Sequence, residues 1–271
     1  MSDGGNTFSQ GDYTWFIGKV VNIMDPEKDA RVQVRIMGYH PDAENQIAVN
    51  DLPWAQVEHG IMSAATKGIG FGPHGLVDGS FVKGHFLDGS DAQLPLVTAT
   101  FPGIGDISEL IKGTNTVKKT LISANGIKEP QSSYKAEYPH NKVLTTTSGH
   151  VIEIDDTPGA ERIHVYHKSG TFIEFRPDGS AIYKHMGQVH NLTNGDLSQV
   201  IIGNFKQVVT GNYEMLVGGN TTIKTNGSMN LQSGSSMNIK SGSSMAIKSG
   251  GSISMKAAGT IKETASVINL N

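Results

Sequence analysis

Short segments of alternating apolar and polar residues fill the first part of the chain, and this alternation is typical of β-strands with one buried face. In residues 31–37, Val32, Val34 and Ile36 fall on one face, and polar side chains separate them. Comparable patterns predict strands at 15–22, 31–37, 52–57, 80–87 and 94–100. Five short strands with one long glycine-rich loop match the size of an OB-type Greek-key barrel, which we expect over residues 13–103.

The pattern weakens between residues 104 and 147, where glycines and prolines interrupt short apolar pieces. This stretch is too short for a folded catalytic domain, so it is predicted to be a linker, and residues 1–12 are predicted to be a flexible N-terminus. Alternation returns in a strand-rich neck at 148–186. Strands are expected there at 151–154, 162–166, 171–175 and 181–183, separated by turn pairs such as Asp178-Gly179.

From Gly187 onward the sequence repeats every eight residues, and we call these units octads. The predicted turn glycines are Gly187, Gly195, Gly203, Gly211, Gly219 and Gly227. Gly234, Gly242 and Gly250 continue the series, but each stands one position earlier in its octad. A first apolar column reads Val189, Leu197, Phe205, Tyr213, Met229, Met237, Met245, Ile253 and Ile261, interrupted by Thr221. A second column, two residues further on, reads Met215, Ile223, Leu231, Ile239, Ile247 and Met255. Each octad is therefore predicted to be one short strand, buried on one face, and one tight turn.

An octad is too short to enclose a core made by its own chain. At roughly 3.3 Å per residue it spans at most about 26 Å, whereas single-chain solenoids use coils of about 18 or more residues. Three copies side by side would close the perimeter. We therefore expect residues 187–271 to form an intertwined three-chain β-helix, or β-prism, with both apolar columns at the shared axis, so that folding and association are one event.

Two other interpretations of the octads fit less well. A flexible Gly/Ser tract would not keep its apolar residues in register over ten units. A calcium-binding β-roll would need an acidic residue in each repeat, but Asp196, Glu214 and Glu263 are the only acids after Gly187.

Composition narrows the possible functions further. Glycine accounts for 33 of 271 residues, and the absence of cysteine excludes disulfides, thiol catalysis and Cys-ligated zinc. The 22 basic and 25 acidic residues give a formal net charge of −3, so nucleic acid or an anionic membrane could be held only by a local patch. No apolar run approaches the roughly 18 residues of a membrane-spanning helix.

The histidines do not predict a metal site. His164 and His167 are three residues apart, a spacing that places them on opposite faces of a strand. No histidine follows His190, so a histidine-ligated tip is not expected either. We predict neither a metal nor a cofactor.

The carboxylates offer only a weak case for catalysis. Asp155 and Asp156 are adjacent, and turn capping explains them better than a pair that converges on one bond. Glu153 and Asp155 share a face that Glu174 could join, which leaves a glycosidase-like arrangement open. We nevertheless predict no catalytic residue.

Two parts of the sequence carry a family resemblance. Residues 148–179, which lead directly into the octads, closely resemble the start of the spike in phage central spike proteins and VgrG-type injection proteins. The N-terminal region resembles the OB domain of the tail-associated spike of T-even phages. Its matching motifs are Trp15-Phe16-Ile17-Gly18, Asp25-Pro26, Arg31-Val32-Gln33-Val34-Arg35, Gly38-Tyr39-His40, Leu52-Pro53-Trp54, Pro73-His74-Gly75 and Gly84-His85-Phe86-Leu87-Asp88.

The resemblance implies a structural central spike that sits in the tail baseplate of a virion, after synthesis in the host cytoplasm. Such a spike seats its OB domain on a hub and punctures the host envelope when a sheath contracts. The implied partners are two further copies of the chain, a separate trimeric hub protein at the OB end and a PAAR-like tip protein at the C-terminal end. The host outer membrane is met mechanically, and no nucleic acid is bound.

One departure from the family bears on activity. T-even spikes carry a lysozyme domain between barrel and needle, whereas only the predicted linker at 104–147 lies at that place here, so we expect no enzyme. Two alternatives remain: the spike of a type VI or other contractile injection system, and a β-helical enzyme that degrades surface glycans. The short octads leave little room for the cleft that such an enzyme needs.

Overall fold

In the computed structural model, residues 13–67, 69–103, 113, 122–124 and 126–269 are described. The named elements in this part of the chain are strands, apart from two three-residue 3-10 helices, η1 (Val49–Asp51) and η2 (Gly89–Asp91), which confirms the predicted all-β class. The predicted flexible N-terminus and much of the predicted linker, at 104–112 and 114–121, lie outside the described residues. Among the described residues, no helix is long and apolar enough to cross a membrane.

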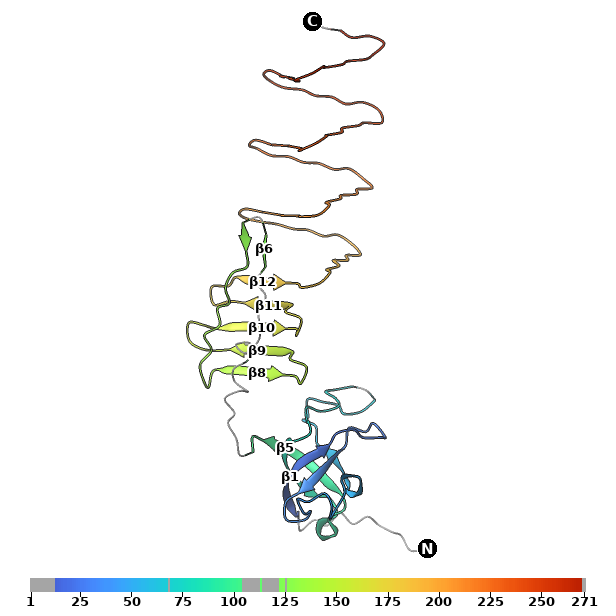
Figure 1. Ribbon diagram of the computed structural model, residues 1–271, viewed down its shortest axis with the longest axis vertical. Helices are drawn as coiled ribbons and strands as arrows, with labels where there is room; N and C mark the ends of the chain where they lie inside the picture. Colours follow the sequence, from blue (N-terminus) through green and yellow to red (C-terminus); the bar gives the residue numbers. More distant parts are fainter. Residues whose placement is uncertain (1–12, 68, 104–112, 114–121, 125, 270–271) are drawn as a thin grey trace. The chain divides into compact units, whose positions relative to one another are not determined.

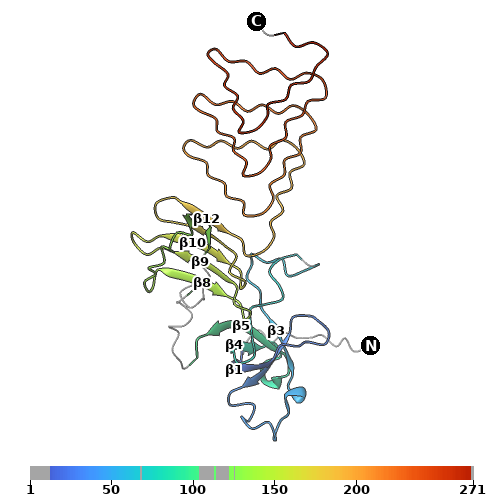
Figure 2. The ribbon, with the colours of Figure 1, turned by 45° about the horizontal axis from the view of Figure 1, so that its top comes forward.

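Five strands close into a barrel near the N-terminus (Figure 2). The barrel order is β1-β2-β3-β5-β4, with β3 and β5 parallel and the other pairs antiparallel, as in an OB domain. The predicted strands agree with the structure to within two residues at each end. The observed bounds are β1 (Trp15–Asn22), β2 (Val32–Ile36), β3 (Trp54–Val57), β4 (Phe81–Phe86) and β5 (Pro95–Phe101).

The barrel contains a core supplied entirely by its own strands and one loop. The buried residues are Phe16, Val20, Val32, Val34, Ile36, Ala55, Leu76, Val82, Phe86 and Val97. Gly84 is needed for this packing, because a Cβ there would lie 2.1 Å from the Leu96 carbonyl oxygen and 2.6 Å from the Phe16 ring. The barrel can therefore bury its apolar residues without a partner.

Strand β2 is more deeply buried than its alternation predicted. The sequence places Gln33 and Arg35 on a polar face, yet every residue of β2 is buried. The Gln33 amide donates to the Leu52 carbonyl at 2.8 Å, and the Arg35 guanidinium donates to two loop carbonyls at 2.7 and 3.0 Å. These bonds satisfy the polar groups, and so the loop after β2 can cover the second face.

A second sheet is a five-stranded antiparallel meander, which we call the neck sheet (Figure 1). Its order is β12-β11-β10-β9-β8, and a two-stranded hairpin of β6 (Ser123–Ala124) and β7 (Ile127–Lys128) precedes it in the chain. The four strands predicted in the neck are present, but β8 falls inside the predicted linker. The bounds are β8 (Asn141–Thr145), β9 (Val151–Asp155), β10 (Arg162–Tyr166), β11 (Phe172–Phe175) and β12 (Ala181–Lys184).

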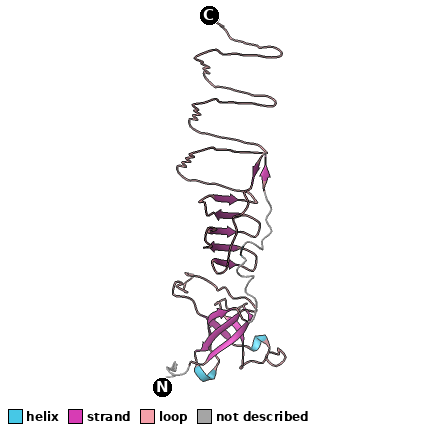
Figure 3. Ribbon diagram, turned by 90° about the vertical axis from the view of Figure 1, so that its left-hand side faces the viewer, coloured by secondary structure: helices cyan, strands magenta, loops and turns pink. Residues whose placement is uncertain are grey.

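The octads differ from the expected row of strands. Between residues 185 and 269 the structure contains bends but no strand, and Figure 3 draws this segment as loop throughout. Residues 209–271 form a compact unit separate from residues 1–208. A strand needs a hydrogen-bonded neighbour, and a single chain of octads does not supply one.

Candidate assembly interface

The two faces of the neck sheet have opposite characters, and the apolar face is the open one. Cross-strand register places Ile152 opposite Val165, and Ile154 opposite Ile163, on one face. Large apolar side chains cover this face and are 45% to 62% exposed. They are Leu144, Ile152, Ile154, Ile163, Val165, Phe175 and Tyr183. A continuous apolar face of this kind marks an interaction surface.

The opposite face of the neck sheet is buried and combines a small apolar cluster, Val151, Tyr166 and Phe172, with a network of charged side chains. The Arg162 guanidinium lies between two carboxylates, 2.6 Å from Glu153 and 3.1 Å from Glu174, and all three side chains are at most 1% exposed. Asn141 donates to Glu153 at 2.9 Å. Arg176 donates to the second carboxylate oxygen of Glu174 at 3.1 Å. A buried charge network is stable only when it is paired in this way.

Two pKa shifts follow from this network. Burial opposes ionisation of Glu174, but hydrogen bonds from Arg162 and Ser132 outweigh it, so the pKa of the Glu174 carboxyl lies below its ordinary value. Burial, assisted by the nearby Glu153 carboxylate, raises the pKa of the Tyr134 hydroxyl. The lowered pKa favours the ionised form of the Glu174 carboxyl in this network.

The charged face is covered by residues 129–137, which we call the strap. The strap crosses the sheet from β12 towards β9 and makes a polar or ring contact with β12, β11, β10 and the segment that follows β9. These contacts join Glu129 to Lys184 at 2.8 Å, Ser132 to Glu174 at 3.0 Å, the Tyr134 ring to Arg162 at 4.9 Å, and the Glu137 amide to Thr157 at 3.0 Å. Sequence reasoning treated this stretch as linker, because its contacts link residues far apart in the chain.

Glu153, Asp155 and Glu174 do share a face, as expected, but they are buried, and Arg162 binds two of them, so the geometry does not favour a glycosidase site there. His164 is fully buried, with Nδ1 3.7 Å from Glu153, whereas His167 is exposed beyond the end of β10. Among the described residues, no group of three or more His, Cys, Asp or Glu side chains could hold a metal ion.

The octads present the second apolar surface. All fifteen residues of the two predicted columns are exposed in the single chain, between 49% and 74%. All nine predicted turn glycines stand in open space, and among them only Gly195 and Gly203 have a positive φ, 142° and 147°, that favours glycine. The columns follow the neck sheet directly in the chain, so one long stretch of apolar side chains lacks cover within residues 141–269.

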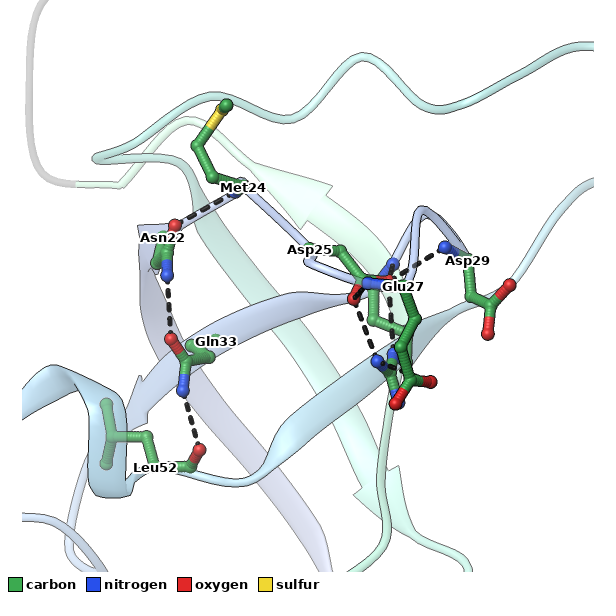
Figure 4. Close-up of polar contacts among 8 residues, drawn as sticks. Asn22, Met24, Asp25, Glu27, Asp29, Gln33 and Leu52 are labelled. Carbon is green, nitrogen blue, oxygen red and sulfur yellow. Dashed lines mark hydrogen bonds and ion pairs between the residues drawn. The ribbon is translucent and has the colours of Figure 1, made fainter.

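On the barrel, the Asp25 carboxylate organises the turn between β1 and β2 (Figure 4). It accepts hydrogen bonds from the backbone amides of Glu27, Asp29 and Arg31 at 2.9 to 3.2 Å. The Arg31 guanidinium adds two more bonds at 2.8 and 3.0 Å. The Arg31 side chain is the main reason that the pKa of the Asp25 carboxyl lies far below its usual range.

This turn forms one wall of a groove of about 800 Å³, and the loop after β3 forms the other. Four groove residues that are not glycine have a positive φ: Lys28 (61°), Ala30 (56°), Ala65 (48°) and Lys67 (51°). Such conformations cost energy and tend to persist where function requires them. The loop also exposes Ile61, Met62, Ile69 and Phe71, which makes this side of the barrel a second candidate contact surface.

The comparisons with known proteins agree with the fold. Residues 38–161 match the Gp5 N-terminal OB domain family. Protein Gp5 of Vibrio phage KVP40 is 29% identical over 245 residues, covering 65% of this chain and 58% of that protein. The pre-baseplate central spike protein Gp5 of Enterobacteria phage T4 is 46% identical over 69 residues, covering 26% of this chain and 12% of that protein.

These matches confirm the resemblance to T4-type central spike proteins. The chain spans little more than half the length of the KVP40 relative and about an eighth of the T4 relative. The family match begins at residue 38, after β1 and β2, so it covers β3 to β5 of the barrel and continues through β9 of the neck sheet. The strand order of the closed barrel is itself consistent with an OB domain.

Proposed function

We propose that this chain is the structural central spike of a contractile tail baseplate and that it acts as a homotrimer which punctures the host envelope. One observation carries the proposal: the apolar face of the neck sheet and the octad columns have no cover among the described residues. Two further copies would cover both, with Val189 to Ile261 and Met215 to Met255 at the axis. Some fifteen apolar residues per chain would then contribute tens of kcal/mol of gross burial.

The mechanical role follows from the proposed closure of the prism. Three chains that close around one axis leave no free sheet edge along the needle. Each layer would be held by backbone hydrogen bonds to the layers above and below it. Such a needle resists buckling and unfolding under an axial load, which is what penetration requires.

The proposal assigns one task to each segment. The barrel at 13–103 would seat on a separate hub protein, and its apolar loop with Ile61 and Phe71 is the best-suited contact surface. The neck at 148–186, with β8 added, would begin the trimer, and residues 187–271 would form the needle. A PAAR-like protein would cover the C-terminal end, and the outer membrane would be met mechanically.

We propose no catalytic role for the chain. The carboxylates with the best mutual placement, Glu153 and Glu174, are buried and paired with Arg162, so neither can reach a glycan. The spike of another contractile injection system would share the same geometry.

Light scattering on the purified full chain tests the proposal. A particle with the mass of three chains and a β-rich circular dichroism spectrum is expected. A monomer would overturn the proposal. Zymography on peptidoglycan provides a separate test of the non-enzymatic assignment, and clearing above background would contradict it.

A further inference from the structure

Charge is distributed unevenly along the chain, although its formal net charge is only −3. Residues 219–271 carry five lysines and one acid, a balance of +4. Residues 1–218 carry 17 basic and 24 acidic residues, a balance of −7. No acidic residue stands between Glu214 and Glu263. The C-terminal octads are therefore basic in a chain that is otherwise acidic.

Four of the lysines occupy one position of the octad, and we call them the lysine ladder. They are Lys224, Lys240, Lys248 and Lys256, each directly after a residue of the second apolar column. Neighbouring side chains of an extended backbone point to opposite sides, so the ladder faces outward when the column faces the axis. All four are exposed, and none takes part in a salt bridge within residues 209–269.

The fold itself does not require lysine at this position. Gln232 occupies it within the ladder, and Leu192, Val200, Val208 and Leu216 occupy it in earlier octads. A row of like charges repels itself and opposes assembly. Solubility alone would be served by charges of mixed sign or by the neighbouring Ser and Asn residues. An anionic binding surface therefore explains the lysine ladder better than a requirement of the fold does.

We propose that the lysine ladder binds the phosphate-bearing headgroups of an anionic lipid bilayer. This inference rests on the proposed function, because the trimer is what would arrange the ladders of three chains into outward rows. An ammonium group is a compact point charge that can bind headgroup phosphates one at a time. Residues 219–271 contain no aromatic residue and no arginine, so base stacking and bidentate phosphate recognition, the usual means of holding nucleic acid, are missing.

Vesicle flotation with the full chain tests the ladder. The probe vesicles contain phosphatidylcholine and phosphatidylglycerol in equal parts, and vesicles of phosphatidylcholine alone serve as the neutral reference. The test variant replaces Lys224, Lys240, Lys248 and Lys256 with glutamine, which copies the natural Gln232. The control variant replaces four exposed lysines outside the octads, Lys19, Lys83, Lys135 and Lys168, with glutamine, so both variants have the same net charge.

We expect the unaltered protein to float with the anionic vesicles only, and less so as salt is added. The ladder variant should bind at least about tenfold more weakly, and the control variant should bind like the unaltered protein. The inference is overturned if the ladder variant binds anionic vesicles as well as the unaltered protein does, or if the unaltered protein does not bind them. It is also overturned if the unaltered protein binds polyphosphate or single-stranded DNA but not vesicles. Light scattering on the same samples separates the two proposals: a trimer that ignores anionic vesicles overturns the ladder alone, whereas a monomer overturns both.

Discussion

In the barrel, Val34 and Phe86 are shielded by other side chains of the same polypeptide, whereas in the octads Met237 is 51% exposed and Ile239 is 71% exposed. The two regions use equally apolar residues. They differ in chain length per layer, because five strands can wrap around a shared interior and an eight-residue unit cannot. The neck sheet is intermediate, since it covers its charged face with its own strap and leaves its apolar face open. The share of its apolar side chains that each region buries within a single chain therefore declines from the barrel to the octads.

The largest effect is expected from Met237→Asp. In the proposed trimer this change places three carboxylates at the axis, where burial strongly disfavours charge. We expect assembly to be lost, with a monomer mass by light scattering. Asn238→Asp, one position further along and on the opposite side, is the matched control and should leave the trimer intact. A trimer that tolerates Met237→Asp would mean that the column does not face the axis.

Arg162→Met tests the charged face of the neck sheet. It leaves Glu153 and Glu174 buried without their shared cation, which should lower the free energy of unfolding by about 3–5 kcal/mol, as measured by urea denaturation. The loss should shrink in acid, where the carboxylates become protonated. Arg176→Met removes a more exposed partner of Glu174 and should have a smaller effect. Equal effects of the two variants would contradict the central role of Arg162.

Phe86→Ala tests whether the barrel is independent of assembly. The cavity left in the barrel core should lower the stability of the barrel by about 3–5 kcal/mol. The mass by light scattering should remain that of the unaltered protein, since no octad residue changes. Trp15→Ala, at an exposed position of the neighbouring strand β1, should change stability far less. Loss of assembly in Phe86→Ala would show that barrel and octads fold as one unit.

Ile163→Ala tests whether the apolar face of the neck sheet is an interface between copies of the chain or a surface exposed to solvent. Ile163 is 47% exposed in the single chain, and if two further copies cover it, truncation should cost about 2–3 kcal/mol in thermal or urea unfolding. Ile61→Ala changes a fully exposed isoleucine of the barrel loop and should stay within about 0.5 kcal/mol in the isolated protein. If Ile163→Ala and Ile61→Ala both change the stability only slightly, the apolar face of the neck sheet is not buried by other copies.

The smallest expected effect is on how the melting temperature depends on pH. Because the folded pKa of Glu174 lies below its ordinary value of 4.5, its contribution to stability is complete above that value and is lost as the pH falls through the folded pKa. The melting temperature of Glu174→Gln should therefore depend less on pH in this acidic range than that of the unaltered protein. Glu161→Gln, at an exposed position just before β10, should keep the original dependence.

The sequence predicted the barrel well and the neck sheet only in part. Alternation located all five barrel strands and four neck strands because it reports which residues share a face. It could not show which face is covered, and the buried face of the neck proved to carry Glu153, Arg162 and Glu174. The strap was missed for the same reason, since its contacts join residues 20 to 55 positions apart and leave no local periodicity.

The octad pattern gave the most specific prediction about assembly, and it is the part that one chain alone cannot test. Its columns are defined by spacing, which a sequence shows directly. Their burial depends on side chains from other copies. The exposed columns are therefore what the sequence hypothesis requires of an isolated chain, and the assembly experiments decide whether the copies meet.

The ion pair between Glu129 and Lys184 joins the first residue of the strap to the last residue of the neck sheet. The polypeptide thus reaches the sheet and departs from it at the same strand. Tension applied along the chain can pass from Glu129 to Lys184 directly, so the meander between them does not have to peel apart strand by strand. This ion pair would have to break before tension reached the more than fifty residues between Glu129 and Lys184.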